Sequence, residues 1–347
     1  MMNQSPLYDV TIIGGGPAGL YSAFYSGLRE MKTKLIEYQP TLGGKLNVYP
    51  EKLIWDVGGV TPITGAKLME QLIEQGMTFN PEVVLNEKVE NIIKNDEGHY
   101  LLYGSSGALH RSKTVIVAVG GGILNPKKLD IEGADRFEIT NLHYTVKSLE
   151  AFKGKRILIS GGGNSAIDWA NELEPLAEKV FVTYRNGELK GHESQVSQML
   201  NSSVTCYFQT FISKLIAAVN KETIDQVELT YIETGEKISL PVDEVMINHG
   251  YERDSDLLQK SSLTLTLKNN KLIAGNAASE TSEPGLFGAG DVLSHNGKLN
   301  LIAGTFQDAV NAVNKAKQFI QPQAEEKGRV SSHNEIFKEK NRKRVRE

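Results

Sequence analysis

Apolar residues in the first forty positions follow two different spacings. Residues 8–13 form a short, mostly apolar run, which predicts a strand buried in a parallel sheet. Downstream, Tyr21, Phe24, Tyr25 and Leu28 recur at i, i+3, i+4 and i+7, the spacing of one helix face. A second strand is predicted at residues 33–36. The chain therefore begins as strand, turn, helix and strand.

The same arrangement returns in the middle of the chain. Residues 155–160 predict a strand, residues 164–170 a helix and residues 180–184 another strand. Residues 114–119 and 245–247 are apolar strands that each lead into glycine, as in the centre of a parallel sheet. The chain thus carries two copies of one α/β unit.

Between and after these units the pattern predicts smaller elements. A helix is expected at residues 64–76, with Leu68, Leu72 and Ile73 on one face, and a meander of short strands at 83–85, 89–93 and 100–103. A hairpin is expected at 226–240, turning at 233–236. A late amphipathic helix is expected at 305–320, with its apolar stripe formed by Phe306, Val310, Val313 and Ile320. Residues 338–347 have six basic residues and no apolar period, which indicates a solvated tail.

The turn in the first unit carries a phosphate-binding pattern. Gly14, Gly16 and Gly19 have the G-x-G-x-x-G spacing, which allows a tight turn, close approach of a pyrophosphate and close packing of helix on strand. The following residues, Pro17 and Ala18, open the helix, whose free N–H groups and dipole favour an anion. Glu37 ends the next strand, 23 positions after Gly14, where an acid binds ribose hydroxyls. We expect a dinucleotide here; the alternative is a strand–turn–helix without a ligand.

The turn in the second unit is G-x-G-x-x-A. Its glycines are Gly161 and Gly163, its final alanine is Ala166, and Asn164 and Ser165 lie between them. The position equivalent to Glu37 is Tyr184, so no acid repels a ribose 2′-phosphate, and Arg185 follows it. The second turn is therefore expected to bind a dinucleotide and to accept a 2′-phosphate on its ribose.

Composition limits the class of protein. A chain of 347 residues with a net charge of −4 suggests about two domains and argues against nucleic acid as the main partner. The single cysteine, Cys206, excludes a disulfide framework and is expected to be a small buried hydrophobe. No apolar run reaches the roughly 20 residues of a membrane span, and the polar start is unlike a signal peptide. We expect a soluble, intracellular, cytoplasmic protein.

Two nucleotide turns followed by Pro284–Asp291 resemble the flavoproteins with two dinucleotide-binding domains. The brevity of the middle domain is most similar to thioredoxin reductase, but that enzyme needs a Cys-x-x-Cys, which a chain with one cysteine lacks. The chain resembles instead the ferredoxin or flavodoxin NADP⁺ reductases of the thioredoxin-reductase-like type. The stretches that carry this resemblance are Gly43-Gly44, Tyr49–Lys52, Asn141–Tyr144, Gly161–Ala170 and Gly297–Ile302.

The resemblance implies an α/β protein with two Rossmann-like domains. An FAD-binding domain would comprise residues 1–120 and 250–347, and an inserted NAD(P)H-binding domain residues 121–249. Hydride would pass from NADPH to FAD and electrons would leave singly to ferredoxin or flavodoxin. A homodimer is implied as well, and the basic tail is a candidate for attracting an acidic ferredoxin.

The resemblance also implies roles for single residues. Tyr49 would stack on or near the flavin ring, Glu37 and Asp291 would hold the ribose and the ribitol, and Lys45 stands where the family usually has Gln. The C-terminal extension, here Ser331-Ser332-His333, would reach toward the flavin. In the second domain Arg185 and Lys190 would contact the 2′-phosphate. Further residues implied at the cofactors are Gly44, Asp56, Val89, Leu124 and Ser332.

No residue is expected to act as a catalytic acid or base, because hydride transfer to flavin needs none. His143, His192 and His249 have no spacing that suggests a metal site. Two other functions are open from the sequence. One is an NAD(P)H oxidase or a reductase of quinones or iron chelates. The other is a non-catalytic redox sensor that responds to NAD(P)H.

Overall fold

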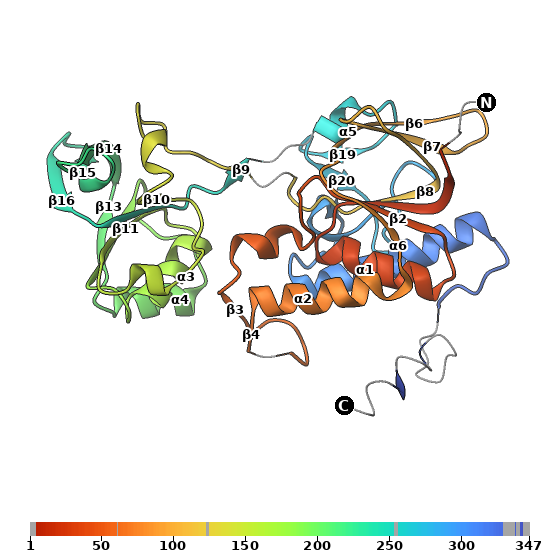
Figure 1. Ribbon diagram of the computed structural model, residues 1–347, viewed down its shortest axis with the longest axis horizontal. Helices are drawn as coiled ribbons and strands as arrows, with labels where there is room; N and C mark the ends of the chain where they lie inside the picture. Colours follow the sequence, from red (N-terminus) through yellow and green to blue (C-terminus); the bar gives the residue numbers. More distant parts are fainter. Residues whose placement is uncertain are drawn as a thin grey trace. The chain divides into compact units, whose positions relative to one another are not determined.

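The computed structural model describes residues 5–60, 62–122, 125–252, 256–328, 337 and 341–342. The chain divides into two compact units (Figure 1). The first unit comprises Met1–Asn47, Leu53–Ile123 and Arg253–Glu347, and the second comprises Val48–Lys52 and Leu124–Glu252. The second unit is thus continuous in sequence except for the five residues 48–52, which come from between two segments of the first.

The first unit is built on one seven-stranded sheet. Five strands are parallel, in the order β5-β2-β1-β8-β21, and β7 and β6 continue the sheet beyond β8 as an antiparallel meander. The central strands β1 and β8 carry side chains buried on both faces, as expected for parallel strands between two layers. The strands are β1 (Leu7–Ile13), β2 (Thr33–Ile36), β5 (Glu82–Val84), β6 (Val89–Lys94), β7 (Tyr100–Gly104), β8 (Leu109–Val117) and β21 (Leu286–Gly288).

Helices form a layer on one face of this sheet. Helix α1 (Pro17–Leu28) packs against both α2 (Gly65–Gly76) and α6 (Ile302–Ile320), as Figure 1 shows. The opposite face packs on α5 (Asp256–Lys260) and on the small sheet of β19 (Leu267–Lys268), β20 (Leu272–Ala274) and β22 (Leu293–Ser294). The hairpin β3 (Leu53–Ile54) and β4 (Ile63–Thr64) and the 3-10 turns η1 (Gly44–Val48), η2 (Met77–Phe79) and η5 (Gly290–Val292) complete the unit.

The second unit contains a five-stranded parallel sheet in the order β10-β17-β11-β12-β13. Alternate residues of β11 face different layers: Ile157 and Ile159 pack with helices α3 and α4, and Leu158 packs with a three-stranded antiparallel sheet, β14-β15-β16. The parallel strands are β10 (Leu142–His143), β11 (Arg156–Ser160), β12 (Lys179–Tyr184), β13 (Thr205–Phe208) and β17 (Glu244–Ile247). The other elements are α3 (Asn164–Leu173), α4 (Glu193–Leu200), β14 (Thr210–Ala217), β15 (Ile224–Tyr231), β16 (Lys237–Pro241), the pair β9 (Asn125–Pro126) and β18 (Tyr251–Glu252), η3 (Asp135–Phe137) and η4 (Glu150–Phe152).

The late helix differs from its predicted amphipathic pattern. Of the four predicted stripe residues only Val313 is buried. The buried face carries mainly small and polar residues instead: Thr305, Asp308, Ala309, Ala312, Val313, Asn314 and Ala316. Small side chains let α6 pack closely on its neighbours, whereas Phe306 lies at the edge of the contact, with its ring 5.0 Å from that of Tyr21. The apolar residues that recur at helical spacing therefore do not make up the buried face of this helix.

Most of the other predicted elements are present, with bounds that differ by one to a few residues. Strand β8 begins at Leu109, before the predicted start, because its polar first half pairs antiparallel with β7. Strand β14 was not predicted. The predicted basic tail falls outside the described residues apart from residues 341 and 342. Among the described residues, no helix has the length and apolarity that crossing a membrane requires.

Candidate dinucleotide sites

The first glycine turn has the backbone geometry that its sequence pattern predicts. Gly14 adopts φ +107°, and a Cβ there would lie 2.5 Å from the Ala118 carbonyl oxygen. A Cβ on Gly19 would overlap the Gly14 carbonyl oxygen. Helix α1 starts at Pro17 with Gly16 as its N-cap and no side-chain cap. The N–H groups of Ala18 and Gly19, in the first turn, have no acceptor within the helix and can therefore bind an anion.

A second loop closes over this turn. Gly44 has φ +56°, and a Cβ on it would lie only 2.8 Å from the Gly16 Cα. The two glycines therefore bring bare backbone together beside the start of α1. Glu37 is buried, and its carboxylate accepts hydrogen bonds from Gly15 N–H at 2.6 Å and Gln39 N–H at 2.7 Å. Each carboxylate oxygen has a further lone pair for a ribose hydroxyl.

The other residues predicted at this site differ in their exposure and in the unit to which they belong. Asp291, in η5, and Lys45, in η1, are exposed, and neither side chain has a hydrogen bond or ion pair with a residue that the structure describes. Asp56 is exposed between β3 and β4, whereas Val89 is buried in the sheet core. Tyr49 belongs to the second unit and packs on the core formed by β11, β12 and α3. Leu124 and Ser332 lie outside the described residues.

The residues present in the first unit fit FAD. A cradle bounded by Gly16 and Gly44, which a Cβ on Gly44 would fill, adjoins an uncapped helix start suited to a pyrophosphate. A buried acid stands at the end of β2, and an exposed acid stands beside α1, since a Cβ on the preceding Gly290 would lie 3.0 Å from the Ala18 Cβ. Two acids flanking a phosphate cradle match the sugar hydroxyls on either side of a dinucleotide pyrophosphate.

The second unit repeats the turn with different surroundings. Gly161 has φ +148°, and a Cβ there would lie 2.6 Å from the Asn248 carbonyl oxygen. Helix α3 starts at Asn164 after the N-cap Gly163, again without a side-chain cap, and a Cβ on Gly163 would meet open space. The buried amide nitrogen of Asn248 has no partner among the described residues. An uncapped helix start and an orphaned donor beside it fit a second dinucleotide.

Two cations flank the second turn. Arg185 follows β12 and is exposed, with no hydrogen bond or ion pair to a residue that the structure describes. The backbone of Lys190 bridges to Gly163, and its N–H donates to the Gly162 carbonyl at 2.7 Å. His249, which sequence reasoning left without a role, bonds Ser160 Oγ through Nε2 at 2.8 Å. Burial, and then the charges of Arg185 and Lys127, lower the pKa of His249. The positive charges that disfavour protonation of His249 would attract a phosphate dianion to the same part of the unit.

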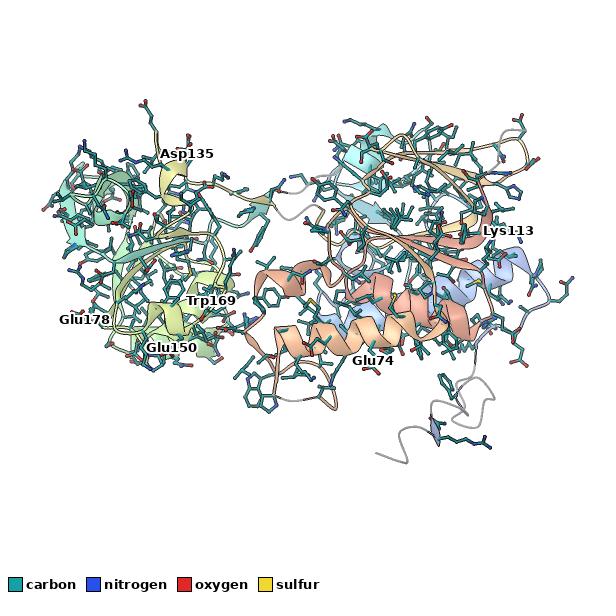
Figure 2. The ribbon with its side chains drawn as sticks, in the orientation of Figure 1. Glu74, Lys113, Asp135, Glu150, Trp169 and Glu178 are labelled. Atoms are coloured by element: carbon teal, nitrogen blue, oxygen red, sulfur yellow. The ribbon has the colours of Figure 1, made fainter. Side chains whose placement is uncertain are left out.

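Two stretches that are far apart in the sequence meet in the second unit. Glu51 accepts the Leu149 N–H at 2.6 Å, and Lys52 bonds Asp168 on α3, beside Trp169, which Figure 2 labels. These contacts, with the packing of Tyr49, attach residues 48–52 to the second unit. Two stretches that carry the resemblance, Tyr49–Lys52 and Gly161–Ala170, thus meet in one contact, which no spacing along the chain could reveal.

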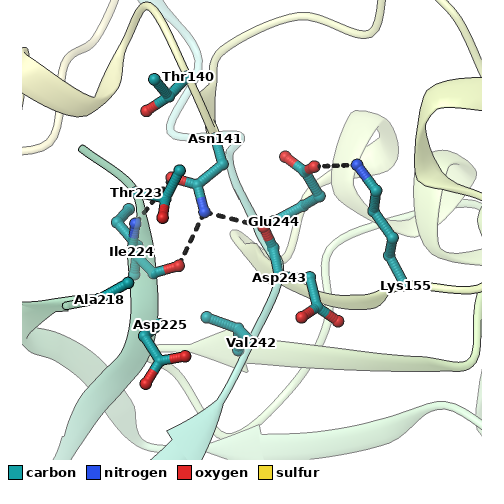
Figure 3. Close-up of a pocket in the computed structure, with 10 residues that line it drawn as sticks. All are labelled: Thr140, Asn141, Lys155, Ala218, Thr223, Ile224, Asp225, Val242, Asp243 and Glu244. Atoms are coloured by element: carbon teal, nitrogen blue, oxygen red, sulfur yellow. Dashed lines mark hydrogen bonds and ion pairs between the residues drawn. The ribbon is translucent and has the colours of Figure 1, made fainter. Parts of the chain in front are cut away.

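A separate hollow of about 380 Å³ lies beside Asn141 (Figure 3). The Asn141 amide donates to the carbonyls of Ile224 and Asp243, both at 2.8 Å, and accepts the Ile224 N–H at 2.9 Å. Lys155 is paired with Glu244, whose other oxygen lies 2.5 Å from His143 Nε2. These groups already satisfy one another. The stretch Asn141–Tyr144 therefore joins strands rather than forming part of a nucleotide site.

Asp243 leads to one prediction about pH. Its carboxylate accepts from Arg156 at the backbone N–H, at Nε and at a terminal guanidinium nitrogen, at 2.8, 3.0 and 2.8 Å. The hydrogen bonds from Arg156 lower the pKa of Asp243. A carboxyl group with a lowered folded pKa stabilises the protein above its unfolded pKa of about 3.9 and loses this effect as the pH falls through the folded pKa.

We therefore expect Asp243→Asn to lower the free energy of unfolding of the second unit at pH 7 by about 1 kcal/mol, since the pair is partly exposed. The difference from wild type should shrink below about pH 4. Urea unfolding followed by fluorescence at both pH values measures this, with Trp55→Phe as the common background so that Trp169 is the only emitter. The matched control is Glu150→Gln: Glu150, which Figure 2 labels, forms an exposed ion pair with Lys153. A difference that is the same at both pH values would contradict the prediction.

A family model described as pyridine nucleotide-disulphide oxidoreductase matches residues 8–316. The chain belongs to the pyridine nucleotide-disulphide oxidoreductase family. Among curated relatives, "Ferredoxin--NADP reductase 1" of Bacillus mycoides is 66% identical over 346 residues, covering 100% of this chain and 99% of its own length. "Ferredoxin--NADP reductase 2" of Exiguobacterium sibiricum is 62% identical over 346 residues, covering 100% and 98%. The resemblance inferred from the motifs is confirmed.

Solved structures place this chain in a known architecture. The thioredoxin reductase of Lactococcus lactis matches with a TM-score of 0.76 at 24% identity, covering 90% of this chain and 99% of that one. The thioredoxin reductase of T. acidophilum matches with a TM-score of 0.77 at 22% identity, covering 90% and 98%. Such likeness concerns the fold, and it confirms the predicted α/β class with Rossmann-type domains.

Proposed function

We propose that this protein is a ferredoxin–NADP reductase: an FAD enzyme that passes electrons between NADPH and ferredoxin without a redox disulfide. Two observations together carry the proposal. In each unit a glycine turn leads into a helix whose start has no side-chain cap, and the whole chain has a single cysteine. The names of full-length relatives at 62–66% identity support the same activity.

In this proposal the first unit binds FAD and the second binds NADPH. The pyrophosphate of FAD is held by Gly14, Gly16, Gly44 and the start of α1. The sugar hydroxyls on the two sides of the pyrophosphate are held by Glu37 and Asp291. When bound, FAD supplies the conversion between hydride transfer and single-electron transfer. The protein's own residues bind and orient. None needs to move a proton at a substrate atom.

The second unit selects the nicotinamide dinucleotide. The start of α3 takes the pyrophosphate, and Arg185 with Lys190 takes the 2′-phosphate. Arg185 lies free of other partners among the described residues, so its guanidinium fork is available to the ligand. The absence of an acid at Tyr184 removes the repulsion that would favour NADH.

We further propose that the protein works in the cytoplasm as a homodimer, with flavodoxin as a second possible acceptor. The support is the resemblance to the thioredoxin-reductase-like ferredoxin reductases. The number of subunits can be measured by sedimentation equilibrium of the FAD-loaded protein. A monomer at micromolar concentration would overturn the dimer while leaving the proposed reaction intact.

The activity is tested by anaerobic titration and by comparing acceptors. The purified protein should release FAD on heating, and NADPH should bleach its visible absorption without oxygen. Turnover should then be faster with ferredoxin or flavodoxin than with oxygen, a quinone or a ferric chelate. A protein that binds NADPH but leaves its FAD oxidised would be a sensor. Fastest turnover with oxygen, a quinone or a ferric chelate would identify the corresponding oxidase or reductase.

The single cysteine yields a prediction of a small effect. Cys206 is half-buried on β13, and burial raises the pKa of its thiol, so it is a poor nucleophile at neutral pH. We expect Cys206→Ser to leave ferredoxin-dependent turnover within about twofold of wild type. Loss of ferredoxin reduction while NADPH still reduces FAD would show that the thiol takes part in electron transfer.

A further inference from the structure

Asp308 is a buried carboxylate in the first half of α6 that the proposed function does not use. The residue is 5% exposed. Its side chain forms an ion pair with Lys298, in which each side chain is 7% exposed. A buried ion pair is costly to desolvate, so its presence calls for an explanation beyond stability.

The Asp308 carboxylate has a second contact, to the backbone of η5. Its Oδ2 accepts a hydrogen bond from Gly290 N–H at 3.1 Å. His295 lies on the other side, with Nε2 3.8 Å from Oδ1. The backbone of Asp308 is also held, since its carbonyl accepts from the fully buried Ser279 hydroxyl at 2.9 Å. Asp308 is therefore fixed both in its helix and at its carboxylate.

Gly290 lies in a turn with little freedom to adjust. It adopts φ +77°, and a Cβ on it would lie 3.0 Å from the Cβ of Ala18, in the first turn of α1. The next residue is Asp291, whose carboxylate is exposed. A hydrogen bond to Gly290 N–H thus fixes the Ala289–Gly290 peptide, one residue before the acid expected to hold the flavin ribitol.

We propose that Asp308 is a positioning residue for the FAD site: by accepting Gly290 N–H it holds the Gly290–Asp291 turn, and Lys298 is the counter-ion that keeps Asp308 in place. This inference rests on the proposed function, because it takes FAD as the ligand of the first unit. Asp308 acts through the turn and needs no contact with the cofactor.

The test compares two double variants from which both charges have been removed. Substituting Asp308 alone would leave Lys298 buried without a counter-charge and risks misfolding. Lys298→Met with Asp308→Leu removes the pair and the acceptor, whereas Lys298→Met with Asp308→Asn removes the pair but keeps a carbonyl that can accept Gly290 N–H. The two carry the same charge and differ in the polar group at position 308, which faces Gly290 N–H and, at 3.8 Å, His295 Nε2.

We expect FAD to dissociate about fivefold more readily from the first double variant than from wild type, and within about twofold of wild type from the second. The measurement is a titration of deflavinated protein with FAD, read by flavin fluorescence and by the visible circular dichroism of the bound flavin. Lys315→Met is the matched control, because Lys315 lies on the same helix and pairs with Glu280 rather than with Asp308.

The coupling to Asp291 provides the decisive measurement. With Asp291→Ala already present, adding Lys298→Met and Asp308→Leu should weaken FAD binding by less than about twofold further, because the turn no longer carries the acid. Additive losses, or equal affinity of the two double variants, would overturn the proposal. Wild-type protein that binds no FAD would refute the proposed function instead.

Discussion

Gly19→Ala should weaken FAD binding severely. A Cβ at this position would overlap the Gly14 carbonyl oxygen, which is backbone and cannot rotate away. The start of α1 would have to move away from the turn that follows β1. The N–H groups that line the phosphate cradle would move with it. We expect FAD affinity to fall by about a hundredfold or more, which corresponds to about 2.7 kcal/mol. The measurement is the FAD content of purified protein and its affinity on adding FAD back.

Two companion variants separate binding from folding. In Gly16→Ala a Cβ would come no closer than 3.7 Å to its nearest neighbour, Gly44 Cα, so the fold tolerates it while the methyl group enters the cradle. We expect this variant to remain folded but to bind FAD more weakly. Gly58→Ala places a Cβ in open space and serves as control. If Gly19→Ala protein kept a full complement of FAD, the pyrophosphate would have to bind elsewhere.

Arg185→Ala should raise the Michaelis constant for NADPH between about tenfold and a hundredfold. A charge-assisted contact to phosphate contributes about 1.5–3 kcal/mol, and Arg185 has no competing partner among the described residues. NADH lacks the 2′-phosphate, so its Michaelis constant should stay within about twofold. Initial rates with both dinucleotides and ferricyanide as acceptor measure the effect.

The neighbours of Arg185 moderate this selectivity. The Asn186 amide donates to the Tyr184 hydroxyl at 2.9 Å, so Asn186 is engaged within the loop and adds no positive charge. Arg185→Lys should be intermediate, because it keeps the charge but loses the bidentate fork. Lys153→Ala, which removes one positive charge from an exposed pair, is the control. Equal effects on NADPH and NADH would mean that Arg185 is structural, and wild-type preference for NADH would contradict the proposal.

Local patterns predicted the parts of the fold that depend on local rules. Both glycine turns, the strands before them and the helices after them could be placed, since glycine spacing and apolar runs act over fewer than ten residues. The class of enzyme followed from the resemblance that the motifs and the quoted stretches carry, and the lone cysteine set thioredoxin reductase aside. Arg185 could be singled out because the role proposed for it depends on its distance from the second turn.

Only the tertiary structure revealed contacts between distant residues. Attachment of residues 48–52 to the second unit depends on Glu51 meeting Leu149 and Lys52 meeting Asp168. The buried face of α6 was mispredicted because the close packing there favours alanines and also buries Asp308. The buried carboxylate is compensated by its ion pair with Lys298 and by the hydrogen bond from Gly290 N–H. The spacing of apolar residues along a helix reflects only how each side chain by itself prefers apolar surroundings or water. Whether a charged side chain is buried depends on the partner that the fold brings to it.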